Sequence, residues 1–220
     1  MRNISTPMIG RRVALSGLVA TATTVLVSSR ISVAQNAAAA TPRQTEGPFY
    51  PVSWTGDIDN DLVVVQGEAA KALGQIAHIE GRVMDVVGNP IAGAKIEIWQ
   101  CDANGIYRHP RDERGGRRRD GGFQGRGRTV SDDKGRYSFR TIKPVTYPGR
   151  TPHIHFRVDP VRGAALITQL YVFGEKQNER DGVLNGIRDT RQRDSVIVKF
   201  DAAAGLEAGA VAARFDLVIG

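Results

Sequence analysis

The sequence predicts an all-β protein, a β-sandwich with long surface loops, and three observations support this prediction. From residue 75 onward, apolar residues recur at every second position in short segments, which is the period of a strand with one buried face. Clusters of Gly, Asn, Asp and Pro separate the segments, as at 88–90, 102–105 and 132–135, and such clusters are typical of turns. Almost no segment has the 3.6-residue period of an amphipathic helix. A barrel is the alternative that these patterns leave open.

The first 40 residues have the composition of an export signal. Arg11 and Arg12 precede an uncharged run, 13–29, and a tract of small residues follows at 34–40. This order matches the regions of a secretory signal, and the paired arginines suggest the twin-arginine route. A membrane-spanning helix is the alternative, but the run is short and diluted by Ser and Thr. We therefore expect an exported protein, periplasmic or extracellular, with a signal peptide over 1–40.

Charge and cysteine content argue against two classes of protein. The chain has 30 Lys and Arg against 23 Asp and Glu, a net charge of +7. Four of those arginines and no acidic residue lie in 1–40, so removing that segment lowers the net charge to +3. We therefore expect no nucleic-acid partner. The single cysteine, Cys101, excludes an internal disulfide and is expected to be a buried small residue rather than a nucleophile.

Residues 41–74 are predicted to form an extended N-terminal arm. Pro42, Pro48 and Pro51 fall within ten residues, which excludes a helix there. A short helix is predicted further along, over 67–73. The β-sandwich domain is then expected over 75–220.

Strands are expected at regular intervals along this domain. In the first, Ile79 and Val83 face the core. In the second, Ile96 and Ile98 face the core and Glu97 points the other way. Further strands are expected at 135–142, 153–158, 165–173, 195–200 and 213–219.

Two long surface loops are expected between the strands. The first, 109–127, contains six arginines and several glycines. It is either a solvated loop or a positive rim that attracts anionic aromatic molecules. The second, 174–194, is charged and contains glycines as well.

His153 and His155 form a His-x-His triplet on a predicted strand. Side chains two positions apart in a strand point to the same face, so the two imidazoles project together. Such a pair is half of a metal site. A pair of ordinary histidines is the alternative, although two of the chain's four histidines fall in this one triplet.

Two tyrosines complete a candidate metal shell. Tyr147 lies on a Pro- and Gly-rich loop six residues before His153, and Tyr107 follows a turn. Two phenolates with two imidazoles suit Fe(III) better than Fe(II) or zinc. Of the other tyrosines, Tyr137 and Tyr171 are predicted to be ordinary strand or core residues, and Tyr50 lies on the arm.

Over residues 42–220 the chain closely resembles the intradiol ring-cleavage dioxygenases, most of all the β-type chain of protocatechuate 3,4-dioxygenase. The segments that carry the resemblance are TEGPFY (45–50), WQ (99–100), GIYRH (105–109), GRYSFRTIKP (135–144), YP (147–148), RTPHIHF (150–156) and TQLY (168–171). The spacing of the two tyrosines and the His-x-His triplet is the most specific part of it.

The resemblance implies a site and an activity. It implies a non-haem Fe(III) ion held by Tyr107, Tyr147, His153 and His155. It also implies that Tyr147 leaves the metal and acts as a base, and that Arg150 and Gln169 are active-site residues. The implied reaction cleaves a catechol-type diol between its hydroxylated carbons with O2, giving a cis,cis-muconate-type dicarboxylate. The implied partners are the catechol, O2 and either further copies of the chain or an α-type chain.

Two other readings compete with this one. The segment 79–105 also resembles transthyretin-like modules, so a non-catalytic exported binding module is the main alternative. Such modules lack the two tyrosines together with the His-x-His triplet. An extradiol or zinc hydrolytic enzyme is the other alternative, and the ligand types argue against it.

Overall fold

The computed structural model describes residues 38–112 and 118–220, and these described residues belong to one compact unit. Almost all of the predicted export signal therefore lies outside the described residues, as do Arg114 and Arg117 of the first predicted loop. Within the described ranges, no helix is long and apolar enough to cross a membrane.

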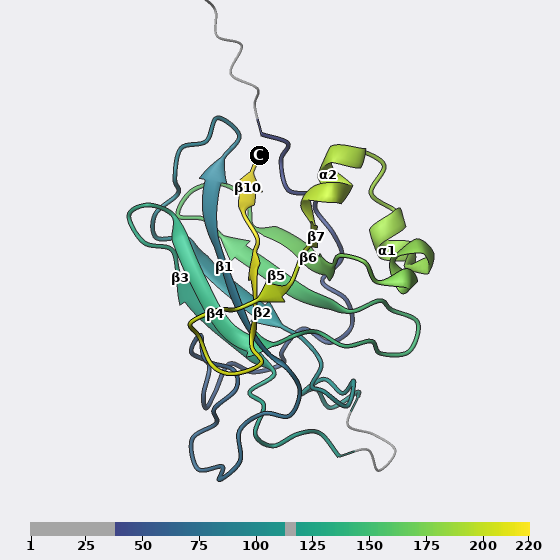
Figure 1. The fold of residues 1–220 in the computed structure, drawn as a ribbon. Helices are drawn as coiled ribbons and strands as arrows, with labels where there is room; N and C mark the ends of the chain where they lie inside the picture. The colour runs from purple at the N-terminus through teal and green to yellow at the C-terminus, as the bar shows by residue number, and fades with distance from the viewer. Residues whose placement is uncertain (1–37, 113–117) are drawn as a thin grey trace, which may run out of the picture. The chain divides into compact units, whose positions relative to one another are not determined.

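In the residues that the structure describes, ten strands form two five-stranded sheets, which confirms the all-β prediction (Figure 1). The first sheet contains β1 (Ile76–Asp85), β4 (Arg136–Ile142), β8 (Asp201–Ala202), β9 (Val211–Arg214) and β10 (Leu217–Ile219). The second contains β2 (Lys95–Trp99), β3 (Arg126–Val130), β5 (His153–Asp159), β6 (Leu166–Val172) and β7 (Ile197–Val198).

Strand β1 is the centre of the first sheet. It pairs antiparallel with β4 on one edge and parallel with β9 and then β10 on the other. Between β9 and β10, the backbone of Phe215 comes so close that a Cβ on Gly81 would lie 1.9 Å from the Phe215 carbonyl oxygen. The sequence therefore needs a glycine in the middle of this strand.

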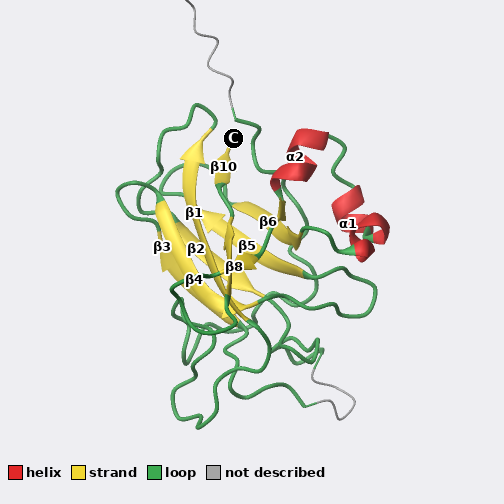
Figure 2. Cartoon of the chain, viewed as in Figure 1, coloured by secondary structure: helices red, strands yellow, loops and turns green. Residues whose placement is uncertain are grey.

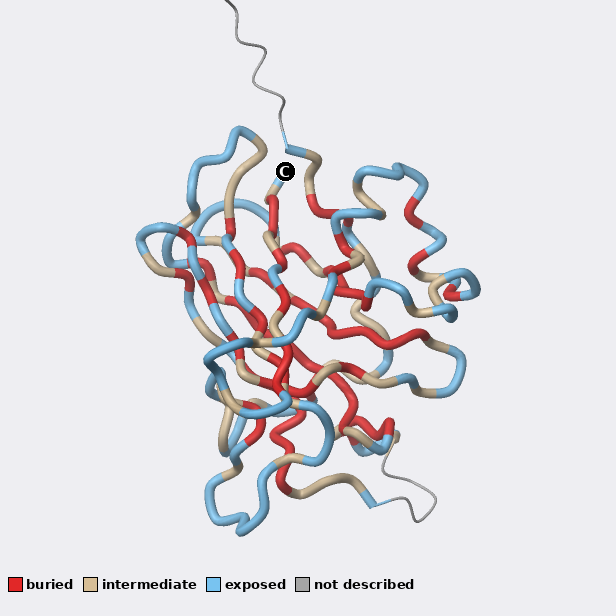
Figure 3. Tube along the Cα trace, in the orientation of Figure 1, coloured by how far each residue is buried: buried red, intermediate tan, exposed pale blue. Residues whose placement is uncertain are grey.

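The second sheet carries β5 at its centre, antiparallel to both β2 and β6. Side chains of the two sheets share one apolar core, in which Phe156 of β5 contacts Phe139 of β4 edge to face at 6.5 Å between ring centroids. Figure 3 shows the buried residues concentrated along the strands. Because Ile154 and Phe156 are in this core, His153 and His155 must face away from it.

Both faces of the second sheet are covered, so Glu97 is buried although the alternating pattern predicted it to point away from the core. The Tyr50 hydroxyl, from the N-terminal segment, donates to Glu97 Oε2 at 2.8 Å. The segment thus covers the outer face of β2 and provides the partner that a buried carboxylate requires.

Three predictions of local structure were wrong. Residues 67–73 form turns rather than a helix, and the Leu73 N–H is bonded to Asp120 instead. The segment 174–194, predicted as a plain loop, contains η1 (Lys176–Arg180), α1 (Gly182–Asn185) and α2 (Thr190–Ser195) (Figure 2). Strand β3 lies at the end of the predicted arginine-rich loop, where Arg126 is buried rather than solvated.

Candidate metal centre

Three of the four predicted ligand atoms converge on one point. The Tyr107 hydroxyl oxygen lies 3.3 Å from His153 Nε2, which lies 3.2 Å from His155 Nε2. Atoms bound at roughly 2 Å to a common metal ion are about 3 Å apart. The spacing therefore fits a shared ion. Within residues 38–112 and 118–220, no three His, Cys, Asp or Glu side chains come together as a possible metal site, so the tyrosine oxygens are essential to this one.

Tyr107 is held in place by its loop. Asp112 Oδ2 accepts from the Tyr107 N–H at 2.7 Å, and the ring of Phe49 stacks on the phenol at 4.8 Å between centroids. Gly105 has φ +71°, and a Cβ there would lie 2.9 Å from the Thr146 carbonyl oxygen. This close approach brings Tyr107 within 5.3 Å of Tyr147, measured between ring centroids.

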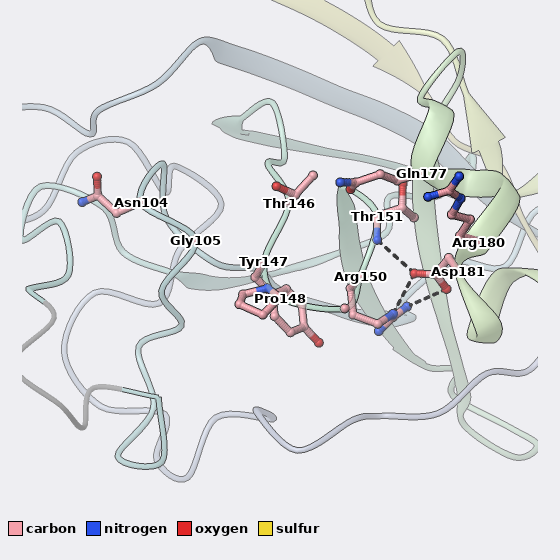
Figure 4. Close-up of a pocket in the computed structure, with 11 residues that line it drawn as sticks. Asn104, Gly105, Thr146, Tyr147, Pro148, Arg150, Thr151, Gln177, Arg180 and Asp181 are labelled. Carbon is pink, nitrogen blue, oxygen red and sulfur yellow. Dashed lines mark hydrogen bonds and ion pairs between the residues drawn. The ribbon is translucent and has the colours of Figure 1, made fainter.

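Tyr147 and Arg150 sit at the two ends of a tight turn. The Arg150 N–H donates to the Tyr147 carbonyl at 3.0 Å, Pro148 occupies the second position, and Gly149 adopts φ +83° in the third. Pro followed by a glycine with positive φ is the pattern of a type II turn. The turn places both side chains on the same cleft of about 580 Å³ (Figure 4).

The Arg150 guanidinium is bound on two sides. Its Nε donates to Asp181 Oδ2 at 2.8 Å, and its Nη2 donates to Gln169 Oε1 at 2.6 Å. Its Nη1 lies 3.5 Å from His153 Nε2. Arg150 therefore connects the cleft to the metal-binding atoms.

Gln169 belongs to a wider hydrogen-bond network that reaches the N-terminal segment. Its Oε1 also accepts from the Tyr171 hydroxyl at 3.0 Å, and its Nε2 donates to the Thr45 carbonyl at 3.0 Å. Gln44 donates to the Tyr171 oxygen at 2.7 Å and accepts from the Gln169 N–H at 2.9 Å. Tyr171 is buried as predicted, but it is also part of this polar network.

The two imidazoles are oriented by different means. His153 Nδ1 lies 2.6 Å from the Thr151 carbonyl oxygen, so Nδ1 carries the proton and donates to it. The Nε2 lone pair is then available to bind a metal ion. His155 Nδ1 is buried, without a hydrogen-bond partner among the described residues. Its ring instead stacks on Trp99 at 4.7 Å with an angle of 8° between the planes.

The electrostatics keep both imidazoles neutral. Burial and the nearby Arg150 charge lower the pKa of His153 to about 4. Burial, His153 and Arg150 lower the pKa of His155 well below its ordinary value. Neutral imidazole is the form that binds a metal ion.

The two tyrosines differ in their surroundings. Burial raises the pKa of the Tyr107 phenol well above its ordinary value. Burial also raises the pKa of Tyr147, but the charge and hydrogen bond of Arg150 oppose that change. Tyr107 is 2% exposed, whereas Tyr147 is partly exposed on the cleft.

Sequence reasoning named six residues here, and the structure brings all six into one region: Tyr107, Tyr147, Arg150, His153, His155 and Gln169. It missed Asp181, Gln44 and Phe49 as neighbours of the site. Asp181 and Gln44 are distant in sequence from the turn and β5, and no local pattern singles them out. Trp99 was part of the resemblance, but its contact with His155 was not predicted.

Comparisons with known proteins identify the family of this chain. A family model described as "Dioxygenase" matches residues 45–220. The protocatechuate 3,4-dioxygenase beta chain of Burkholderia cepacia is 34% identical over 185 residues, covering 80% of this chain and 78% of that protein. A hydroxyquinol 1,2-dioxygenase of Rhodococcus opacus is 33% identical over 180 residues, covering 71% of this chain but 54% of that protein.

Solved structures give the same picture. The dioxygenase domain of a dioxygenase carbohydrate-binding protein fusion from Streptomyces sp. SirexAA-E superposes with a TM-score of 0.60 at 27% identity, covering 82% of this chain and 97% of that one. Catechol 1,2-dioxygenase from Acinetobacter sp. ADP1 superposes with a TM-score of 0.61 at 23% identity, covering 81% of this chain and 62% of that one. The second match supports the fold alone.

Proposed function

This chain belongs to the intradiol ring-cleavage dioxygenase family, and from that premise we propose that it is a non-haem Fe(III) enzyme acting on catechols. It would cleave the ring between the two hydroxylated carbons with O2, giving a cis,cis-muconate-type dicarboxylate. The observation that carries the proposal is the meeting of the Tyr107, His153 and His155 donor atoms beside the cleft that Tyr147 and Arg150 line. The alternative of a non-catalytic binding module is not favoured, because the relatives are named dioxygenases.

The proposed ligands are Tyr107, Tyr147, His153 and His155. Two phenolates and two neutral imidazoles match the preference of ferric iron for hard oxygen donors with borderline nitrogens. When bound there, Fe(III) would supply Lewis acidity and a template for the diol.

Tyr147 is the ligand suited to leave. It borders the cleft and is partly exposed, so its phenol has room to swing away when a diol enters. Because burial raises the pKa of this phenol, the displaced phenolate oxygen would be a good base for a proton of the diol. Tyr107, enclosed by Phe49 and the loop around it, would stay bound.

Arg150 would stabilise negative charge that develops on the ring. Its pKa is raised because the hydrogen bond and charge of Asp181 outweigh the effect of burial, so the guanidinium stays charged. A fixed cation in a partly closed cleft is the kind of group that stabilises a charged transition state. Gln169 would act through its hydrogen bond to Arg150.

Two further proposals rest on sequence alone. We propose that residues 1–40 direct export, because their composition has the order of a twin-arginine signal. We also propose that the chain assembles with itself or with an α-type chain, since one relative is named a beta chain. Size-exclusion chromatography with light scattering, and localisation of a chain with Arg11 and Arg12 replaced by lysine, would test these two proposals.

Reconstitution with iron tests the central proposal. The loaded protein should be red-brown from phenolate-to-Fe(III) charge transfer, and the band should shift when a catechol is added. Oxygen uptake should accompany the appearance of muconate absorbance across a panel of substituted catechols. A protein that remains colourless after iron reconstitution would rule out the proposed site.

A further inference from the structure

We propose that Asp181 is a positioning residue. Its carboxylate fixes the direction of the Arg150 guanidinium and the start of β5, the strand that carries the two histidines. The inference rests on the proposed function, because it assigns a role within that site. Figure 4 shows Asp181 across the cleft from Tyr147, with its carboxylate facing Arg150 and Thr151.

The two carboxylate oxygens of Asp181 have different main partners. Oδ1 accepts from the Val183 and Leu184 N–H groups, each at 3.0 Å, and so caps the first turn of α1; it also accepts a longer bond from Arg150 Nη2, at 3.4 Å. Oδ2 accepts from Arg150 Nε at 2.8 Å and from the Thr151 N–H at 3.0 Å. One side chain therefore joins α1 to the segment that leads into β5.

Burial makes these contacts strong constraints. The Asp181 side chain is fully buried, at 0% exposure, and the Arg150 side chain is 15% exposed. A buried carboxylate without partners is costly, so the pair holds together tightly. Burial alone would raise the pKa of Asp181, but Arg150 and the backbone donors of Leu184 and Thr151 lower it below its ordinary range. The carboxylate is therefore ionised at neutral pH.

The arrangement leaves one edge of the Arg150 guanidinium to face a bound diol. Asp181 accepts from Nε, and Gln169 and Asp181 both accept from Nη2, while Nη1 points to the metal-binding side, 3.5 Å from His153 Nε2. Rotation about the Arg150 side chain would break the bonds to Asp181 and Gln169 together. Asp181 therefore selects which nitrogen of Arg150 faces a bound diol.

The same carboxylate reaches His153 through one residue. Asp181 Oδ2 holds the Thr151 N–H, and the Thr151 carbonyl oxygen contacts His153 Nδ1 at 2.6 Å. The Thr151 hydroxyl is also tied to Asn178 Oδ1, at 2.7 Å, in the neighbouring η1 segment. Thr151 is thus held in the position in which its carbonyl oxygen orients the His153 imidazole.

A purely structural role for Asp181, as the cap of α1, is the competing explanation. The chain offers a matched comparison, because Asp189 caps α2 by accepting from the Gln192 N–H at 3.1 Å. Asp189 does not line the cleft that Tyr147 and Arg150 share. Any effect of losing a helix cap alone should therefore be common to both positions.

Asp181→Asn separates the two roles. Asparagine caps a helix about as well as aspartate, so the oxygen at the Oδ1 position can still serve α1. The amide nitrogen then faces the Arg150 Nε–H and the Thr151 N–H, which are both donors, so the 2.8 Å bond to Arg150 is lost and only the 3.4 Å bond from Nη2 to the Oδ1 position remains. We expect kcat to fall on the order of 10-fold to 100-fold with iron content retained, and the thermal midpoint to fall more than in Asp189→Asn, because the buried Arg150 loses its charged partner.

A double-mutant cycle with Arg150→Gln decides between the explanations. If Asp181 acts mainly through Arg150, adding Asp181→Asn to Arg150→Gln should lower kcat much less than Asp181→Asn lowers it in the original protein, whereas the Asp189→Asn effect should be the same in both backgrounds. Equal losses of kcat from Asp181→Asn in both backgrounds would overturn the proposal. If Asp181→Asn alone does not fold, the double variant with Arg150→Gln decides. A folded double variant supports the proposal, and an unfolded double variant overturns it.

A second measurement needs neither iron nor a catechol, so it remains informative if the ring-cleavage assignment fails. In protein labelled with ¹⁵N-arginine, the Arg150 Nε–H should exchange slowly with solvent because it is bonded to a buried carboxylate. The signal is assigned by its loss in Arg150→Gln. We expect fast exchange in Asp181→Asn and unchanged slow exchange in Asp189→Asn. Slow exchange that persists in Asp181→Asn would overturn the proposed contact.

Discussion

Trp99 lies flat against the imidazole of His155, with ring centroids 4.7 Å apart and planes 8° apart. Trp99 itself is the last residue of β2, and it pairs with His155 across the two strands. Because His155 Nδ1 has no hydrogen-bond partner in the described part of the chain, this stacking replaces the carbonyl contact that orients His153. The indole therefore sets the direction of the His155 Nε2 lone pair.

Trp99→Leu should lower iron affinity about 10-fold, because the imidazole would lose the surface that orients it. Iron titration followed by the charge-transfer band would measure this. Trp54→Leu is the matched control, since Trp54 packs near Tyr50 rather than on a histidine. Equal losses of affinity in the two variants would show that the stacking does not orient the ligand.

Gly47 provides a second constraint on the same ring. It has φ +74°, and a Cβ there would lie 3.3 Å from His155 Cε1, so Gly47→Ala should displace the imidazole and lower iron affinity. Gly56 has φ +78°, and a Cβ there would meet nothing within 4 Å, so Gly56→Ala carries only the backbone cost of about 1 kcal/mol. Iron stoichiometry and thermal midpoint should separate the two variants: both lose stability, and only Gly47→Ala loses iron.

Tyr107→Phe should remove most of the charge-transfer colour, because it deletes one phenolate of the proposed shell. Tyr137→Phe should leave the colour intact. The Tyr137 hydroxyl donates to the Phe215 carbonyl in the core, so its loss should cost about 1 to 3 kcal/mol of stability instead. Absorbance spectra and denaturant unfolding of the two iron-loaded variants check this, and bleaching by Tyr137→Phe would contradict the choice of ligands.

Glu207 should make the stability of the fold depend on acid pH. It accepts from Arg140 Nη2 at 2.6 Å and from His78 Nε2 at 3.0 Å, and the hydrogen bond from Arg140 is the main reason that its pKa is lowered to about 2 from 4.5. Since the folded pKa is depressed, the stabilisation is complete above pH 4.5 and is lost as the pH falls toward 2.

Glu207→Gln should therefore cost about 1 kcal/mol at pH 7, a modest value because the pair is partly exposed to water. The difference in unfolding free energy between Glu207→Gln and the original protein should shrink as the pH falls from 4.5 to 2. Urea unfolding at a series of pH values would measure it, with the exposed Glu68→Gln as the control. A difference that stays constant down to pH 2 would contradict the assignment.

The parts of the fold that the sequence could predict are those with a strong repeating pattern. The alternation in β1 and β5 identified the core faces, and with them the shared direction of His153 and His155. Strand β3 was missed because its sequence, RGRTV, is polar and its buried Arg126 depends on distant backbone partners. The helices α1 and α2 are too short to show a period, and their aspartate caps are visible only once the chain is folded.

The site divides in the same way. His153 and His155 follow from local spacing, and Tyr107, Tyr147, Arg150 and Gln169 from the resemblance. The partners that orient these side chains, such as Asp181 and Trp99, depend on which segments meet in three dimensions. No pattern within a short window of sequence contains that information.

The order in which the chain is synthesised matters for one contact in the first sheet. The Thr41 N–H donates to the Val218 carbonyl at 2.9 Å, and its hydroxyl accepts from the Val218 N–H at 2.8 Å, so the N-terminal segment is anchored by β10. Gln44, three residues beyond, is the one that bonds Gln169 and Tyr171. On a nascent polypeptide, Thr41 therefore lacks this anchor until β10 has emerged from the ribosome, so the hydrogen-bond network around Gln169 depends on a strand made long after it.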